Sequence, residues 1–284
     1  MLKHLCWLFL FTCSWTHAAS VWQVSNAGNT VYIGGTLHIL SPEDFPLPNA
    51  YGVAYNQADE LVFETDIAGL NSPRFQQDSR ARLTYGDGTQ LKDVISKETY
   101  QALKAHLTAR QMDIAAMANY TPALISITLS FTELRLMGLT SQGVDEFYYF
   151  KAMTDGKSLD WFESPQQQLE FIAALGGEDE DEMIRYTLDD VKQLPKALGE
   201  LKKYWLSGDM EGLYQSQGKS FHDDFPEIYQ QLLIQRNKNW LPAIEEILTT
   251  AQTEFVLVGT MHLSGKHSVL DMLRDKGYQV SQVN

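Results

Sequence analysis

The stretch VYIGGTLH at residues 31–38 decides the fold, because a second stretch near the other end of the chain repeats it. FVLVGTMH at residues 255–262 has the same order of an apolar run, a glycine, a threonine and a histidine. Short runs rich in β-branched and aromatic residues and bounded by glycine are typical of buried strands. Each of the two histidines, His38 and His262, therefore follows the carboxyl end of a predicted strand.

A third predicted strand, LVFETDI at residues 61–67, carries Glu64 and Asp66 near its carboxyl end. In α/β sheets ligands bind outside the carboxyl ends of the strands, so neighbouring strands would bring His38, Glu64 and His262 into one crevice. Two imidazoles and one carboxylate suit zinc, manganese, cobalt or iron and leave positions open for water. Asp66 is a candidate second ligand or general base. A metal-free site, in which one histidine is the general base, fits the same spacing.

The predicted fold class is α/β, with a central sheet built from the N- and C-terminal segments and a large, mostly helical middle insertion at about residues 91–248. Apolar residues at three- and four-residue spacing predict helices in this insertion, and a further helix and a short strand after the second motif. The predicted helices span residues 92–110, 121–137, 166–175, 181–206, 226–248 and 268–276. The segment before the third strand is expected to form a strand, helix, strand unit, whose usual outcome is a parallel pair of strands.

The first 18 residues have the features of a secretory signal peptide. Lys3 provides a positive charge, residues 5–11 are apolar, and Thr16-His17-Ala18 is a plausible cleavage site. We therefore expect a periplasmic or extracellular protein, with residues 19–284 as a single domain and no transmembrane segment in the mature chain. An alternative is a lipoprotein anchored at Cys13, although Phe11 and Thr12 fit a lipobox poorly.

Cysteine content and net charge limit the metal ligands and the binding partners that are expected. Cys6 and Cys13 both lie in the signal segment, so the mature chain would have neither disulfides nor thiolate ligands, and any metal would have nitrogen and oxygen ligands. The mature chain would carry 21 Lys and Arg against 36 Asp and Glu, a formal charge of −15. This balance excludes nucleic acid and anionic membranes as expected partners, because phosphate binding needs a basic surface.

Several motifs of the chain resemble those of the TraB/GumN family. They are the two Gly-Thr-x-His motifs, the predicted strand at residues 62–66, Gly143-Val144-Asp145, WFESPQQQL at residues 161–169 and Arg236-Asn237. That family is related to the Tiki metalloproteases and linked to erythromycin esterase-like and haem-uptake ChaN-like proteins. The resemblance implies a metal-dependent hydrolase in which the two motif histidines and the glutamate form the centre. Manganese or cobalt supports peptidase activity in the Tiki branch.

The resemblance also assigns roles to individual residues of this chain. His38, Glu64 and His262 would bind the metal and form the catalytic centre, with Asp66 or Glu163 managing protons. The remaining motif residues would support the site or bind substrate: Asp145, Gln168, Arg236, and the motif glycines Gly35 and Gly259.

Three functions remain open at this stage. The leading hypothesis is an exported metal-dependent hydrolase that cleaves a peptide or ester bond of a peptide or small-molecule substrate, with manganese, cobalt or zinc as cofactor. The second is a protein that binds a peptide or pheromone without turnover, and the third is a metal or haem carrier. A shared fold does not transfer a substrate, and the sequence predicts no oligomeric state.

Overall fold

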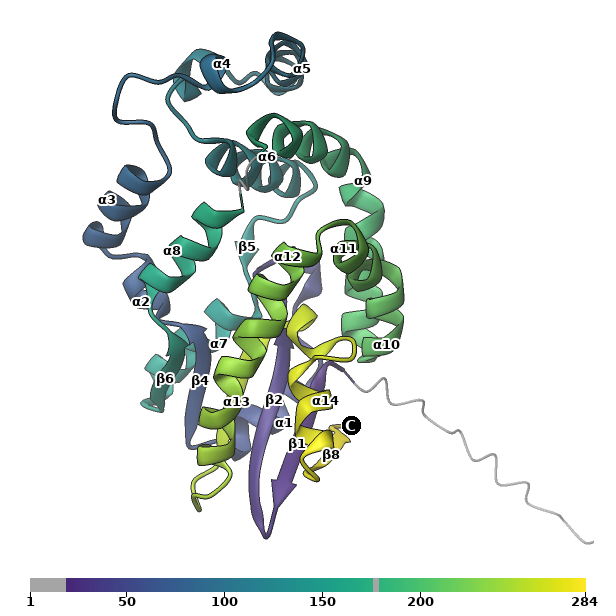
Figure 1. Cartoon of the computed structure of the whole chain (residues 1–284). Coiled ribbons are helices and arrows are strands. Elements are labelled where there is room, and N and C mark those ends of the chain that lie inside the picture. The colour runs from purple at the N-terminus through teal and green to yellow at the C-terminus, as the bar shows by residue number, and fades with distance from the viewer. Residues whose placement is uncertain (1–18, 176–178) are drawn as a thin grey trace, which may run out of the picture.

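A computed structural model describes residues 19–175 and 179–284 of the chain (Figure 1). Within these residues six strands form one sheet in the order β6-β4-β7-β2-β1-β8. Strands β6, β4, β7 and β2 run parallel, whereas β1 is antiparallel to both of its neighbours. The bounds are β1 Val21–Asn26, β2 Asn29–Thr36, β4 Glu60–Thr65, β6 Ser158–Glu163, β7 Glu254–Gly259 and β8 Gln279–Gln282. The α/β class is therefore confirmed.

The two repeated motifs lie side by side. Strands β2 and β7 are paired in parallel, with Gly35 opposite Val258 and Thr36 opposite Gly259. Both motif histidines consequently leave the sheet at the same edge, which confirms the strand placement expected from the repeat.

Strand β7 also changes one expected pairing. Strands β2 and β4 are parallel, as the strand, helix, strand pattern predicts, but β7 lies between them and pairs with both. The expectation that they would pair directly is wrong, because the last parallel strand of the chain inserts into the centre of the sheet. This insertion places Glu64, on β4, beside the second motif as well as near the first.

Helices cover both faces of the sheet (Figure 1). Helices α1 (Asn49–Gln57) and α7 (Val144–Asp155) pack with Phe255 and Leu257 of β7 in one core. Helices α10 (Met210–Leu213), α13 (Arg236–Ile247) and α14 (Val269–Asp275) pack with Val256 and Val258 in the other. Alternate residues of β7 thus enter opposite cores, which explains why its sequence is apolar throughout.

The middle of the chain is mostly helical, as predicted, and part of it has its own core of residues from α5, α6 and α9. Its helices are α2 Ile67–Leu70, α3 Pro73–Arg82, α4 Leu91–Val94, α5 Lys97–Thr108, α6 Pro122–Leu136, α8 Pro165–Ala174, α9 Glu180–Ser207, α11 Lys219–Asp224 and α12 Pro226–Tyr229. It also contributes β6 to the sheet, so the sheet is not built from the chain ends alone. A small second sheet pairs β3 (Ile39–Leu40) with β5 (Ser141–Gln142).

The predicted signal peptide, residues 1–18, lies outside the described residues. Of the helices in the described part of the chain, none has the length and apolar character needed to span a membrane.

Candidate functional site

His38 lies just beyond β2 and is held by helix α7. Its Nδ1 is 2.8 Å from Oδ2 of Asp145, in the first turn of that helix. The neighbouring Gly143 is required for this contact, because a Cβ there would lie 2.3 Å from the Leu37 carbonyl oxygen. The Asp145 carboxylate raises the pKa of His38 to about 9. The His38 side chain is 63% exposed, and its Nε2 lies on the side of Gly259, 3.5 Å from the position of a Cβ on that glycine.

His262 has the opposite environment, although its motif is the same. It is 4% exposed, and its ring lies 4.4 Å from that of Trp240. Its Nε2 is 3.2 Å from Nη1 of Arg236, and its Nδ1 is 2.6 Å from Oδ1 of Asn237. Because a guanidinium only donates hydrogen bonds, Nε2 must accept and Nδ1 must carry the proton. Burial lowers the pKa of His262 to about 3, which keeps the ring neutral.

Glu64 connects the two motifs. Its Oε1 accepts the backbone N–H of Gly259, and its Oε2 lies 2.5 Å from Nη2 of Arg236. Burial raises the pKa of this carboxyl, but its interactions with His262, Arg236 and His38 and the hydrogen bond from Gly259 lower it more, and the resulting pKa is about 2. Glu64 is therefore ionised at neutral pH.

Arg236 is the buried cation of the site, with 7% of its surface exposed. It begins α13, directly after the π-helical segment Gln230–Gln235, a type of segment that is frequent at functional sites. Its Nε and Nη2 both bind the carboxylate of Glu163, at 2.9 and 2.8 Å. The guanidinium also lies over the rings of Phe171 and Trp240, at 5.2 and 4.8 Å.

Glu163, at the end of β6, is saturated with hydrogen bonds. Besides Arg236 it accepts from Trp240 Nε1 at 2.8 Å and from Gln168 Nε2 at 2.5 Å, and it is 5% exposed. A carboxylate with all these donors has few lone pairs left for a ligand. Its role in this structure is to hold Arg236, and Gln168 supports it.

The two motif glycines, Gly35 and Gly259, have different roles. A Cβ on Gly259 would lie 3.1 Å from Glu64 Oε1, 3.5 Å from His38 Nε2 and 3.6 Å from His262 Cδ2. Three predicted site residues thus converge on the bare face of this glycine. A Cβ on Gly35 would instead lie 2.6 Å from Thr260 Oγ1, so this glycine permits close packing of the two motifs.

Asp66 does not join these residues in the described interactions. The strand ends at Thr65, and Asp66 is the N-cap residue of α2. Its Oδ2 lies 2.6 Å from the position that a Cβ would take on Gly69. The condition for Asp66 to share a face with Glu64, that the strand continues through it, is not met.

The donor set fits a divalent metal in its chemistry. Each imidazole is oriented through Nδ1 by an outer partner, Asp145 or Asn237, which leaves Nε2 as the inward nitrogen, as is usual for metal-bound histidines. Asp145 Oδ1 is buried and has no hydrogen-bond partner among the described residues. As arranged, however, the described residues contain no group of three or more His, Cys, Asp or Glu side chains positioned for an ion. Arg236 Nη1 would have to withdraw from His262 Nε2.

Two residues of the site were missed from the sequence, the aromatic Phe171 and Trp240 that flank Arg236. Trp240 follows Arg236 by one helical turn, so it shares a face of α13 with it. That spacing was the available signal, but an apolar residue at helical spacing ordinarily indicates core.

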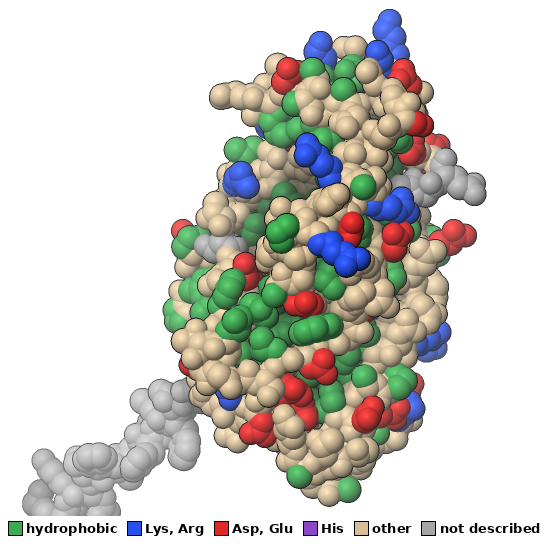
Figure 2. Space-filling model, turned by 90° about the vertical axis from the view of Figure 1, so that its left-hand side faces the viewer, with side chains coloured by type: hydrophobic (Ala, Val, Ile, Leu, Met, Phe, Trp, Pro, Cys, Tyr) green, Lys and Arg blue, Asp and Glu red, His purple; other side chains and the backbone are tan. Residues whose placement is uncertain are grey.

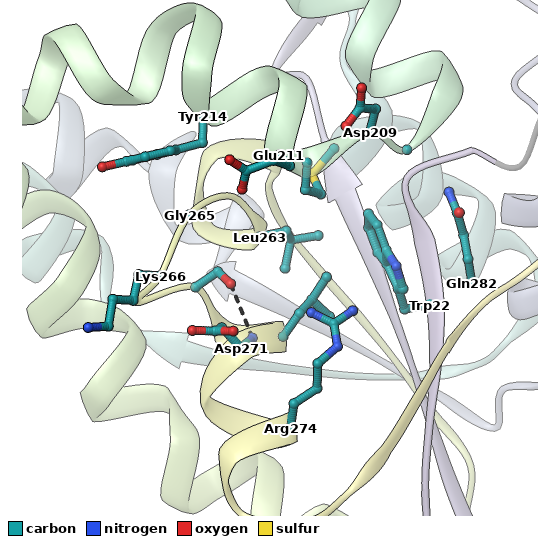
Figure 3. A pocket seen from close by; sticks show the side chains of 14 residues that line it. Trp22, Asp209, Glu211, Tyr214, Leu263, Gly265, Lys266, Asp271, Arg274 and Gln282 are labelled. Carbon is teal, nitrogen blue, oxygen red and sulfur yellow. Dashed lines mark hydrogen bonds between the residues drawn. The ribbon is translucent and has the colours of Figure 1, made fainter.

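A separate cavity of about 660 Å³ lies beside the loop that follows His262 (Figure 3). Its lining includes Trp22, Glu211, Tyr214, Lys266 and Arg274. None of the predicted site residues lines it, so it is distinct from the strand-end site.

The fold and site define an α/β protein with parallel central strands whose carboxyl ends present two histidines and two glutamates, with an arginine supplied by helix α13. A family model, TraB/PrgY/gumN, matches residues 20–282, and the chain belongs to this family. Comparison with curated proteins and with solved structures gives no match for the chain.

Proposed function

We propose that this protein is an exported metal-dependent hydrolase that cleaves a peptide or ester bond, with His38, Glu64 and His262 as the metal ligands. The observation that carries the proposal is the convergence of these three side chains on the bare face of Gly259. Export rests on the signal-like residues 1–18. Manganese, cobalt and zinc are the candidate ions.

Charge also favours a cation here. Glu64 and Glu163 are two buried carboxylates, and Arg236 is the one buried guanidinium bound to both. These three groups carry a net charge of −1, since His262 is neutral. Uncompensated charge is costly in a buried site, so a divalent ion would be attracted to it.

The chain's own residues have separable tasks. Asp145 and Asn237 fix the orientation of the two imidazoles, and Asn237 also donates to the backbone carbonyl of His267 at 2.9 Å. Arg236, held by Glu163, presents a fixed positive charge for an anionic substrate group or a developing oxyanion. A bound divalent metal would lower the pKa of a bound water and polarise the scissile carbonyl.

The test is hydrolysis of a mixed peptide library and of chromogenic esters by protein reconstituted with manganese, cobalt or zinc. We expect turnover that a chelator abolishes and that is lost in His262→Ala. His222→Ala is the matched control, because His222 is half exposed, pairs with Asp223 and packs against the ring of Tyr229. Unchanged peptides and esters with all three metals would contradict the proposal and leave a binding protein as the better interpretation.

Arg236 favours a second candidate, a hydrolase that works without a metal. Its Nη1 already occupies the lone pair of His262 Nε2. His38, oriented by Asp145, would then be the general base through Nε2, in the manner of a carboxylate–histidine pair. Because the pKa of His38 is about 9, this activity should rise with pH up to about that value. Turnover that resists chelators but is lost in His38→Ala would identify this case.

A further inference from the structure

Strand β6 is a free edge of the central sheet. Within the described residues it pairs with β4 and with no other strand. Trp161, in its middle, is 42% exposed. Figure 2 shows the side of the molecule on which β6 lies, and in the lower half of this view hydrophobic side chains lie among acidic ones. The carboxyl end of β6 is Glu163, so this edge leads directly to the Arg236 site.

A pocket of about 390 Å³ opens beside this edge, between β6, α8 and α13. Its walls combine aromatic and aliphatic side chains with polar ones, among them Gln167 and Asn239. Phe162 of β6 stacks on Trp240 at 5.4 Å between ring centroids, and Phe171 of α8 lines the pocket as well. Phe171 and Trp240 are also the rings over which Arg236 lies, so pocket and site share a wall.

The charged side chains that line this pocket are all acidic: Asp160, Glu163 and Glu246. Glu163 is neutralised by Arg236. Asp160 and Glu246 are exposed and take part in no ion pair among the described residues. The groove therefore carries two exposed negative charges beside the aromatic rings that line it.

We propose that this groove binds an extended peptide segment in which a basic residue lies two positions from an apolar one, so that both side chains point to the same face. The segment lies along β6, its apolar side chain enters the pocket, and its cation lies between Asp160 and Glu246. This inference rests on the proposed function, because it places the bond to be cleaved at the Glu163 end of the groove.

A second copy of the chain is a poorer occupant. Each copy has a formal charge of −14 and would bring its own Asp160 and Glu246 to the interface. Asp160 Oδ1 also accepts the backbone N–H of Trp161 at 2.8 Å, and a carboxylate at an edge discourages pairing between identical strands. Charge complementarity thus selects a basic partner.

The probe is the capped hexapeptide Lys-Ser-Phe-Ser-Lys-Ser, whose lysine and phenylalanine side chains share one face when it is extended, and its counterpart with glutamate for lysine. Binding is measured by calorimetry on Glu64→Gln protein, so that turnover plays no part. The groove variant is Asp160→Lys with Glu246→Lys. The control is Asp189→Lys with Asp275→Lys, which changes net charge equally at two exposed positions away from the groove.

We expect the lysine peptide to bind Glu64→Gln protein whose groove is unchanged. The groove variant should bind this peptide at least about tenfold more weakly, because like charges across an interface repel. The groove variant should gain affinity for the glutamate peptide, and the control should change little. A second variant, Ala243→Trp, should block the pocket without altering charge. Equal loss in the control, unchanged binding in the groove variant, dimerisation through this edge, or absence of binding would overturn the inference. Binding without cleavage would instead count against the proposed hydrolase.

Discussion

The two copies of the Gly-Thr-x-His motif end in histidines with opposite properties. His38 is 63% exposed and faces a carboxylate, whereas His262 is 4% exposed and lies between an amide and a guanidinium. The pKa of His38 is raised to about 9, and that of His262 is lowered to about 3. The repeated motif therefore fixes where the backbone delivers a histidine, while partners from α7 and α13 decide its charge.

The largest effect is expected from Arg236→Met. The substitution leaves Glu64 and Glu163 buried without their cation, and breaking a buried ion pair costs about 3–5 kcal/mol of unfolding free energy. Urea denaturation measures this. Arg185→Met is the control, because Arg185 is 60% exposed and makes a surface pair with Asp181 that contributes little. Equal stability of the two variants would show that Arg236 does not hold the site together.

The two motif glycines offer the next comparison. Gly35→Ala should destabilise the protein by about 1–3 kcal/mol, since a Cβ would overlap Thr260 of the other motif. Gly259→Ala should leave unfolding nearly unchanged but weaken metal binding by about tenfold or more, because its Cβ enters the space where His38, Glu64 and His262 converge. Thermal unfolding and metal titration of both variants test this. A reversal of the two outcomes would contradict the conclusion that the three metal ligands converge at Gly259 and not at Gly35.

Asp145→Asn should make the first histidine resemble the second. Without the carboxylate, the pKa of His38 should fall from about 9 towards its ordinary 6.5, as NMR titration in the presence of a chelator would show. In the wild type, the pair stabilises the fold below pH 6.5 and this contribution is lost as pH rises through 9. Because the ring is well exposed, the contribution is about 1 kcal/mol or less. A His38 pKa that stays near 9 in the variant would exclude Asp145 as the cause.

The smallest effect concerns the opposite end of β7, where Glu254 is buried beside Glu60 of the neighbouring strand. Burial and the Glu60 charge raise the pKa of Glu254 to about 7, the reverse of Glu64, which has Arg236. Since the folded state binds the extra proton, stability falls as pH rises from 4.5 through 7. Glu254→Gln should therefore flatten this slope and add about 1 kcal/mol at pH 8. Urea midpoints at pH 5 and pH 8 decide this, and an unchanged slope would contradict it.

Much of the framework follows from local sequence. Apolar runs ended by glycine identify β2 and β7, and helical spacing identifies α5, α6, α8, α9 and α13. The insertion of β7 between β2 and β4 does not follow from local pattern, because strand order depends on packing between segments far apart in the chain. The prediction of a mostly helical middle likewise did not include β6, a short strand at the edge of the sheet.

The sequence predicts which residues form the site but not how they contact one another. His38, Glu64 and His262 do converge at neighbouring strand ends, as their positions after apolar runs indicate. The sequence predicts that Arg236 supports the site or binds substrate; in the structure it lies between Glu64 and Glu163 and donates to His262. A lone arginine in an amphipathic helix gives no sequence signal of such burial, because its partners lie 172 and 73 residues away in the chain.

Cobalt titration followed by visible absorption tests the central claim most directly, that His38 and His262 hold one ion together. The account predicts one Co²⁺ per wild-type chain, with loss of the ligand-field bands in both His38→Ala and His262→Ala and retention in His222→Ala. Full binding in either of the first two variants would show that the two motifs do not share a metal.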